Sequence, residues 1–218
     1  MTEFERLADL VRANTRPALA DTIRVVEQMV AVPPREHPLG FVFWQQLLNS
    51  RLSLRAHLWF DAEFKRDDGL TLVHDHIYEL SSLVVYGGIR NTLFDVSRAP
   101  SDQQIVTVDP TSLQIHPEDG GETVAPTAVA YGDYHPGDIY SIAPGVFHSS
   151  IVTSSPALTL VTNSPGFGRP RVLTTGAGEI RSVTRKPSPS GAWRASLEHV
   201  LEELARQGVW ASDIREVP

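Results

Sequence analysis

Three histidines have the residue type and spacing of a metal site. His74 and His76 flank Asp75, and His148 ends the stretch from Gly137 to His148 later in the chain. On a β-strand, side chains two residues apart point to the same face, so His74 and His76 can bind one ion. A third histidine after a Pro-Gly turn completes the set. The sequence therefore predicts a metal ion bound by His74, His76 and His148.

A site with three protein ligands leaves positions on the metal open to water, substrate or dioxygen, and such open positions are typical of catalytic metals. Neutral imidazole binds most first-row metals, so the ligand set accepts Fe, Ni, Mn, Co or Zn. The alternative is that His-x-His is a surface pair on a strand. The second histidine segment favours the metal site.

These segments resemble the two motifs of the cupin superfamily. The first motif has a glycine, His-x-His, a glutamate and another glycine, and the second has a glycine followed by Pro-x-Gly-x-x-His. The matching residues are Gly69, His74, His76, Gly87 and Gly88 in the first motif, and Gly137, Gly145 and His148 in the second. Pro144 stands one place later than usual. The resemblance implies an all-β cupin fold, a double-stranded β-helix (jelly-roll) barrel.

The glutamate of the first motif is displaced in this chain. The family pattern places it at Leu80 or Ser81, whereas the sequence has Glu79. We count Glu79 as a candidate metal ligand, with a position beside the ligands or in solvent as the alternative. Strand alternation puts Glu79 on the opposite face from His74 and His76 unless a bulge or turn follows His76.

Within the cupins, residues 50 to 173 are most similar to the cysteine dioxygenase-type thiol dioxygenases. The similarity lies in segments 54–59, 88–94 and 157–165, around the two motifs. It implies Fe(II) and a reaction between dioxygen and a small thiol. The cysteine and tyrosine that are crosslinked in many of those enzymes fall on Ser81 and Asn163, and their metal-adjacent histidine and tyrosine fall on Val161 and Asn163. The acid-base network of that family is therefore not carried over intact.

The segment before the first motif reads as a strand with one polar and one apolar face. Arg55, His57 and Trp59 share the polar face. If this face lines the cavity, His57 is an acid-base or hydrogen-bonding group and Arg55 holds a substrate carboxylate in a bidentate pair. The alternative is that Arg55 and His57 face solvent. The resemblance favours His57 and Trp59 as pocket residues.

Two further residues are candidates for the site. Tyr78 follows His76 closely and can donate a hydrogen bond into the pocket, with a buried structural tyrosine as the alternative. Asn163 is counted with the substrate contacts because the family resemblance places a site residue there. The remaining histidines, which we expect in loops or at the surface, are His37, His116, His135 and His199.

The elements around the site form one predicted domain, residues 1–218. Residues 2–50 are expected to be helical: Thr2 and Glu5 have capping-box spacing, Pro17 can open a second helix, and Phe41 to Leu48 is apolar enough for a short third helix. The barrel is expected over about 52–185, a linker at 186–190, and a helix over about 191–207 that stops at Gly208.

Composition excludes several classes of partner. The chain has a formal net charge of -7, with 19 Lys and Arg against 26 Asp and Glu, so a nucleic-acid partner is not expected. No apolar run approaches the length of a membrane span or of a leader's apolar core, so we expect no membrane contact and a cytoplasmic location. The absence of cysteine excludes disulfides and a thiolate nucleophile.

The sequence predicts a mononuclear non-haem dioxygenase that acts on a small molecule, with a thiol-bearing amino acid such as cysteine as the first candidate. The predicted cofactor is one divalent metal ion, Fe(II) first and Ni, Mn, Co or Zn otherwise, and the partners are the small-molecule substrate and dioxygen, with a homodimer left open. The alternatives are a metal-dependent cupin isomerase or lyase for a sugar or keto acid, and a non-enzymatic ligand-binding cupin.

Overall fold

The computed structural model describes residues 1–37, 39–49, 52–60, 70–109, 114–118, 122–163, 166, 168–175 and 191–210. Gly69 of the first motif and the expected linker 186–190 lie outside these residues. The described helices are α1 (Glu3–Arg12), α2 (Leu19–Met29) and α3 (Ala192–Gln207). The strands are β1 (Arg35–His37), β2 (Phe41–Leu47), β3 (Ser53–Trp59), β4 (Leu70–His74), β5 (Leu80–Arg98), β6 (Gln103–Val108), β7 (Ile115–Pro117), β8 (Val124–Tyr134), β9 (Ile139–Ile142), β10 (Phe147–Asn163) and β11 (Arg171–Thr175).

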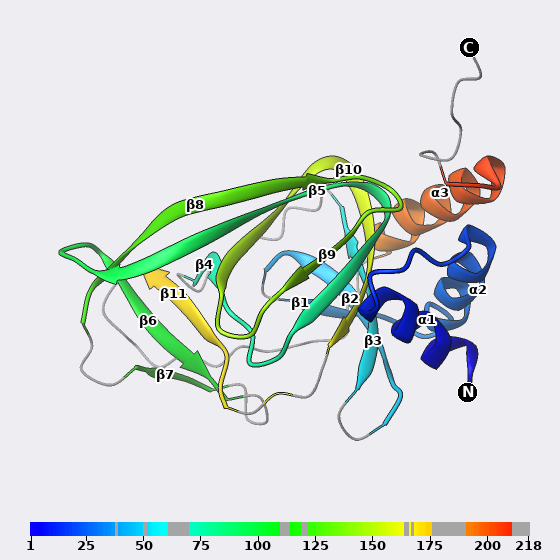
Figure 1. Ribbon diagram of the computed structural model, residues 1–218. Helices are drawn as coiled ribbons and strands as arrows, with labels where there is room; N and C mark the ends of the chain where they lie inside the picture. The colour runs from blue at the N-terminus through cyan, green and yellow to red at the C-terminus, as the bar shows by residue number, and fades with distance from the viewer. Residues whose placement is uncertain are drawn as a thin grey trace, which may run out of the picture.

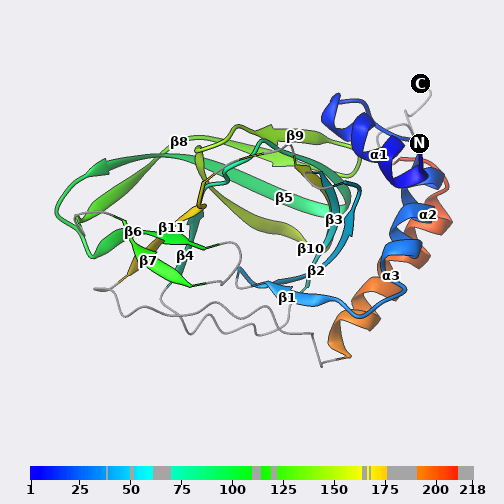
Figure 2. The same cartoon turned by 90° about the horizontal axis from the view of Figure 1, so that it is seen from below.

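The strands form one curled antiparallel sheet, which confirms the predicted all-β core (Figures 1 and 2). The hydrogen-bonded path runs β1-β2-β3-β10-β4-β11-β6-β7, and the long strand β5 pairs with β10, β8 and β9. β5 and β10 each change neighbours along their length, with register shifts in their pairing. Irregularities of this kind bend strands, and bent strands let a sheet close around an interior.

The N-terminal helices begin as the sequence predicts. In the capping box of α1, Thr2 Oγ1 accepts from the Glu5 N–H at 3.2 Å and the Thr2 N–H donates to Glu5 Oε2 at 2.7 Å. Both contacts satisfy backbone N–H groups that would otherwise lack partners at the start of the helix. The second helix begins at Leu19, shortly after Pro17.

The predicted third helix, Phe41 to Leu48, is wrong, because this segment is strand β2. β2 pairs with β1 on one edge and with β3 on the other. Its first four residues are all buried. The sequence therefore lacks the alternation of apolar and polar residues that marks a strand with one solvent-exposed face. Val42 and Trp44 pack in the main core, whereas Phe41 lines the cavity on the other face of the sheet.

The main core lies between the helices and the outer face of the sheet. On β3, Leu54, Ala56 and Leu58 are fully buried in the same cluster as residues of all three helices. Each large apolar side chain buried in this way contributes about 1.5–3 kcal/mol. Trp210 ties the two ends of the described chain together, since its Nε1 donates to the Pro17 carbonyl at 2.8 Å. The apolar face of β3 therefore points at the helices, and the polar face points inward.

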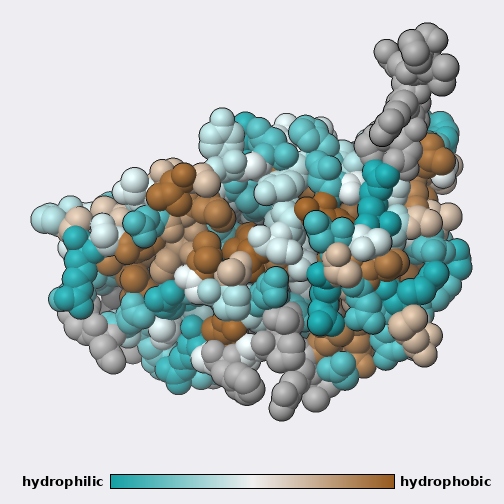
Figure 3. Space-filling view, viewed as in Figure 1, coloured by the Kyte–Doolittle hydropathy of each residue, from teal (hydrophilic) through white to brown (hydrophobic). Residues whose placement is uncertain are grey.

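The C-terminal helix matches its prediction. Trp193, Leu197, Val200 and Leu204 are buried, and Gly208 caps the helix with φ 69° in the left-handed region that glycine tolerates. None of the described helices is both long and apolar enough to span a membrane. In Figure 3, apolar residues also reach the surface over β8, where Val129 is 62% exposed.

Candidate metal centre and its cavity

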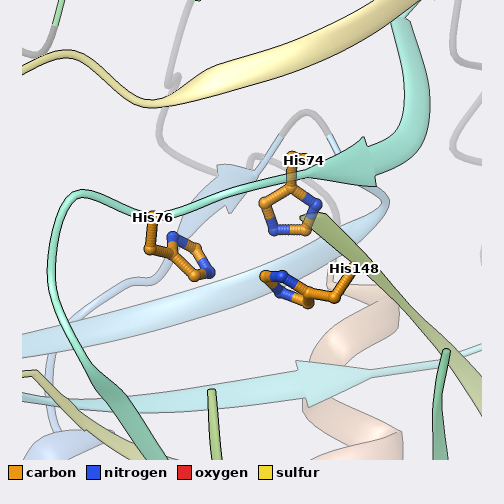
Figure 4. A group of neighbouring side chains, drawn as sticks. All are labelled: His74, His76 and His148. Carbon is orange, nitrogen blue, oxygen red and sulfur yellow. The ribbon is translucent and has the colours of Figure 1, made fainter. Parts of the chain in front are cut away.

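The structure brings the three predicted ligands together. His74 ends β4, His76 lies in the turn that follows, and His148 is the second residue of β10 (Figure 4). His74 and His148 are cross-strand partners, which sets them side by side. One nitrogen of each ring lies within 4.8 Å of one nitrogen of each of the other two. The predicted spacing rule therefore holds, with β10 supplying the third imidazole.

Backbone carbonyls fix which nitrogens face one another. Nδ1 of His74 lies 2.8 Å from the carbonyl of Leu72, and Nδ1 of His148 lies 3.2 Å from the carbonyl of Val146. Because a carbonyl only accepts, Nδ1 carries the proton in each ring and Nε2 keeps its lone pair. A metal-binding histidine is commonly held by this kind of contact.

Burial keeps the imidazoles neutral. Burial lowers the pKa of His74, and it lowers the pKa of His148 to about 3. The pKa of His76 lies well below its ordinary value, first because of burial and then because positive charge on His74, His148 or Arg55 disfavours another proton nearby. Neutral imidazole is the form that binds metal, so these residues fit a divalent ion without first losing a proton.

The second motif is bonded directly to the first. The Gly145 N–H donates to the His76 carbonyl at 2.8 Å, and Gly145 has φ 75°, which a residue with a side chain rarely adopts. Asp75 points away from the ligand cluster and bonds Arg171, as strand alternation predicts. The backbone of both motifs thus sets the positions of the three rings.

Glu79, counted above as a candidate ligand, does not lie with the histidines. It is exposed and lines a hollow beside α1 together with Asp9, Arg12, Ala13 and Ser81. Among the described residues, the ligand cluster holds His74, His76 and His148 without Glu79. His76 and Glu79 lie between β4 and β5, and the turn that joins these strands leaves Glu79 outside the cluster.

The histidines open into a cavity of about 400 Å³. Arg55, His57 and Trp59 line it from β3, so the polar face of that strand points to the metal site and not to solvent. Apolar side chains form most of the remaining wall, including Leu39, Ile77, Leu80, Val108, Ile142, Val161 and Val172. A mostly apolar cavity with a few convergent polar groups is the usual form of a small-molecule site.

Tyr78 lies between the ligands and Arg55. Its ring stacks on His76 with centroids 5.1 Å apart and an interplanar angle of 14°, and its hydroxyl accepts from Arg55 Nη1 at 3.5 Å. Arg55 Nε and Trp59 Nε1 are buried and have no hydrogen-bond partner among the described residues. Unused donors in a cavity wall favour a ligand that brings acceptors.

Asn163 lies away from this wall. Its Oδ1 accepts from the Ser53 N–H at 3.2 Å and from Ser53 Oγ at 2.7 Å, which joins the end of β10 to the start of β3. It is not among the described residues that line the cavity. The structure therefore shows Asn163 as a link between the two strands.

Sequence reasoning missed several cavity residues, among them His37 and Tyr140. His37, expected in a surface loop, ends β1 and lines the cavity, and Tyr140 of β9 lines it as well. Burial raises the pKa of Tyr140, so its phenol stays protonated. The signal for His37 was the alternation of Phe41 and Phe43 after Gly40, which fits a strand returning from a turn. The other histidines lie outside the cavity, with His135 72% exposed at its side chain.

No family model matches this sequence. No curated protein matches it either. Among solved structures, the chain is similar to a variant of oxalate decarboxylase from Bacillus subtilis, with 14% identity and a TM-score of 0.37, over 64% of this chain and 29% of that one.

Two other solved structures show similarity at the same level. One is hydroquinone 1,2-dioxygenase from Sphingomonas sp. with 4-hydroxybenzoate bound, with 14% identity and a TM-score of 0.34 over 55% of this chain and 62% of that one. The other is an RmlC-like cupin from Shewanella frigidimarina, with 17% identity and a TM-score of 0.33 over 63% of this chain and 86% of that one. The match spans less than two thirds of the decarboxylase and of the hydroquinone dioxygenase. At these TM-scores the fold assignment rests on the strand pairing of the chain itself.

Proposed function

We propose that this protein is a mononuclear non-haem metal enzyme that uses dioxygen to oxidise a small organic molecule. The observation that supports the proposal is the cluster of three neutral imidazoles, His74, His76 and His148, at the wall of a mostly apolar cavity. Three protein ligands suit a catalytic metal better than a structural one, because structural sites usually have four. Fe(II), which the motif resemblance favours, supplies the one-electron chemistry that dioxygen activation needs.

The side chains around the metal have separate proposed roles. Arg55 binds an anionic group of the substrate through its guanidinium, and Tyr78 orients that group through its hydroxyl. His57 serves as an acid-base or hydrogen-bonding group from the same strand, and Trp59 closes the wall beside it. The apolar remainder of the wall excludes water from the reacting atoms.

The first substrate to test is a thiol-bearing amino acid such as cysteine, because the resemblance to the thiol dioxygenases spans both motifs. The experiment is anaerobic purification with elemental analysis, followed by measurement of oxygen uptake by the Fe(II)-loaded protein with a panel of thiols. Oxygen uptake that depends on both Fe(II) and a thiol supports the proposal. Absence of uptake with every thiol contradicts the thiol assignment.

A second candidate is a cupin isomerase or lyase acting on a sugar or keto acid. The observation that favours it is the all-imidazole ligand set, which also accepts Zn(II), a metal without redox chemistry. Conversion of a sugar or keto acid by the Zn(II)-loaded protein without oxygen would establish this activity. Ligand binding with neither activity would favour a binding protein.

A further inference from the structure

The cavity has one wall that lies outside the segment resembling known enzymes. β1 and β2 form an antiparallel hairpin in which His37 pairs with Phe41. On the other edge of β2, Phe43 pairs with His57 and Gln45 pairs with Arg55. His37, Phe41, Gln45, Arg55 and His57 all line the cavity. The inner face of β1, β2 and β3 is therefore aromatic at one end and polar at the other.

The aromatic end is a continuous stack of rings. Phe41 lies 4.3 Å from His37 at an interplanar angle of 7° and 4.5 Å from His57 at 28°, measured between ring centroids. Trp59 is 4.2 Å from Phe41. Phe41 itself is only 4% exposed, whereas His37, His57 and Trp59 remain partly exposed. The ring surface offered to the cavity is that of the three outer residues.

Contacts with the backbone and with other rings hold this surface in place. The Leu39 N–H donates to Nδ1 of His37 at 3.3 Å, which fixes the orientation of that ring. Phe43, which is buried, meets both His37 and His57 edge-on. A preorganised aromatic surface favours a flat π-bearing group, because such a group stacks without ordering the wall first.

The charges of the cavity select the polar end of the ligand. Among the described lining residues, Arg55 is the one lysine or arginine, and its Nε is buried with no hydrogen-bond partner. Asp75 is the one acidic residue among them, and both of its carboxylate oxygens already bond Arg171. The described wall thus offers a positive charge to an anionic group of the ligand. It offers no free carboxylate to an ammonium group of the ligand.

We propose that the ligand of this cavity is a monocarboxylate with a planar aromatic group and no ammonium group. The carboxylate binds Arg55 beside Tyr78, and the aromatic group lies against His37, His57 and Trp59. The inference rests on the proposed function, since it names the substrate class of the same site, and it replaces the thiol-bearing amino acid by an aromatic acid as the first substrate. An ammonium group that leaves water without gaining a carboxylate partner costs several kcal/mol, so α-amino acids are disfavoured.

The test is calorimetric binding to the full chain loaded with Zn(II), which binds without turnover. The probes are 3-phenylpropanoate, L-phenylalanine, which differs by the ammonium group, and 3-cyclohexylpropanoate, which differs by the aromatic ring. We expect 3-phenylpropanoate to bind at least about tenfold more tightly than L-phenylalanine, the ratio that corresponds to about 1.4 kcal/mol. 3-Phenylpropanoate should also bind at least roughly threefold more tightly than 3-cyclohexylpropanoate, because ring stacking adds to the free energy gained from apolar burial.

Matched variants locate the two ends of the ligand. Trp59→Leu should abolish the preference for the phenyl over the cyclohexyl acid, and Trp59→Phe should keep it. Arg55→Met should weaken both acids alike, with circular dichroism showing that the variant is folded. Equal binding of 3-phenylpropanoate and L-phenylalanine, or no binding of 3-phenylpropanoate at millimolar concentration, overturns the inference.

These measurements separate this inference from the proposed function. Binding to the Zn(II) protein needs no dioxygen, so the ligand preference can hold when the Fe(II) protein consumes no oxygen, in which case the proposed reaction fails alone. If the Fe(II) protein oxidises cysteine while 3-phenylpropanoate does not bind to the Zn(II) protein, the ligand class is wrong and the reaction stands.

Discussion

Asp75 holds Arg171 with both of its carboxylate oxygens. Oδ1 accepts from the Arg171 backbone N–H and Oδ2 accepts from Arg171 Nε, each at 2.6 Å. Asp75 is 3% exposed, and it stands between His74 and His76 in the chain. The same alternation that turns the two imidazoles into the cavity turns this carboxylate towards β11. The ion pair thus anchors the strand end from which the ligands project.

Replacing Asp75 by Ala should lower the free energy of unfolding by about 2–4 kcal/mol, because the buried contacts to Arg171 are lost on both backbone and side chain. Zn(II) affinity should fall as well, since His74 and His76 lose their support. Urea unfolding and metal titration measure the two effects. Asp95→Ala, an exposed change on β5, is the control, and an equally small effect of both substitutions would contradict this role for Asp75.

The metal assignment predicts that His148→Ala binds little metal while the barrel remains folded. His148 supplies one of three ligands, so its loss leaves two, which hold a divalent ion poorly. Elemental analysis of the purified protein gives the metal content, and circular dichroism checks the fold. His135→Ala is the matched control, because this histidine is exposed beside the second motif and should leave the content unchanged. Full occupancy in His148→Ala would refute the site.

Much of the metal centre could be predicted because its rule is local. Strand parity places His74 and His76 on one face, and a turn at Gly145 brings the next strand alongside, so two short segments determine most of the geometry. The same parity sorted the two faces of β3. Strand parity does not say which face of β3 packs against the helices, because both faces of that strand are partly covered.

The errors arose where the neighbouring structure overrides the local pattern. β2 is apolar on both faces because it lies between the helical core and the cavity, and such a run has no strand periodicity. His37 reaches the cavity only because β1 pairs with β2. The residues around His37 do not predict this pairing. Asn163 faces Ser53 instead of the cavity because β10 meets β3 there.

Glu79 can be tested with a change that removes charge and keeps shape. Because Glu79 is exposed beside α1 and lies outside the histidine cluster, Glu79→Gln should leave Zn(II) affinity within about threefold of the parent, a difference below the tenfold that corresponds to about 1.4 kcal/mol. Competition with a chromophoric chelator measures this affinity. A loss as large as that of the His148→Ala protein would make Glu79 a fourth ligand and overturn the three-histidine description.

The lowered pKa values of the ligands predict how the metal-free protein responds to acid. In the unfolded chain, His148 takes up a proton near its ordinary pKa of 6.5, whereas in the folded protein its pKa is about 3. The unfolded state therefore binds more protons as the pH falls below 6.5, and folding stability is lost with them. The loss continues down to the folded pKa and is absent above the unfolded one.

For His148 alone, the expected loss approaches about 1.4 kcal/mol per pH unit below the unfolded pKa, and His74 and His76 change stability in the same direction. Urea unfolding of the metal-free protein between about pH 7.5 and pH 5.5 measures it, above the range in which most carboxylates titrate. His148→Gln should reduce the slope, because the glutamine carries no titrating group. Zn(II) should raise stability by a similar amount across this range, because the folded histidines are already neutral and release no proton when they bind the metal. Stability that stays constant or rises as the pH falls would show that the three imidazoles are protonated in the folded cavity.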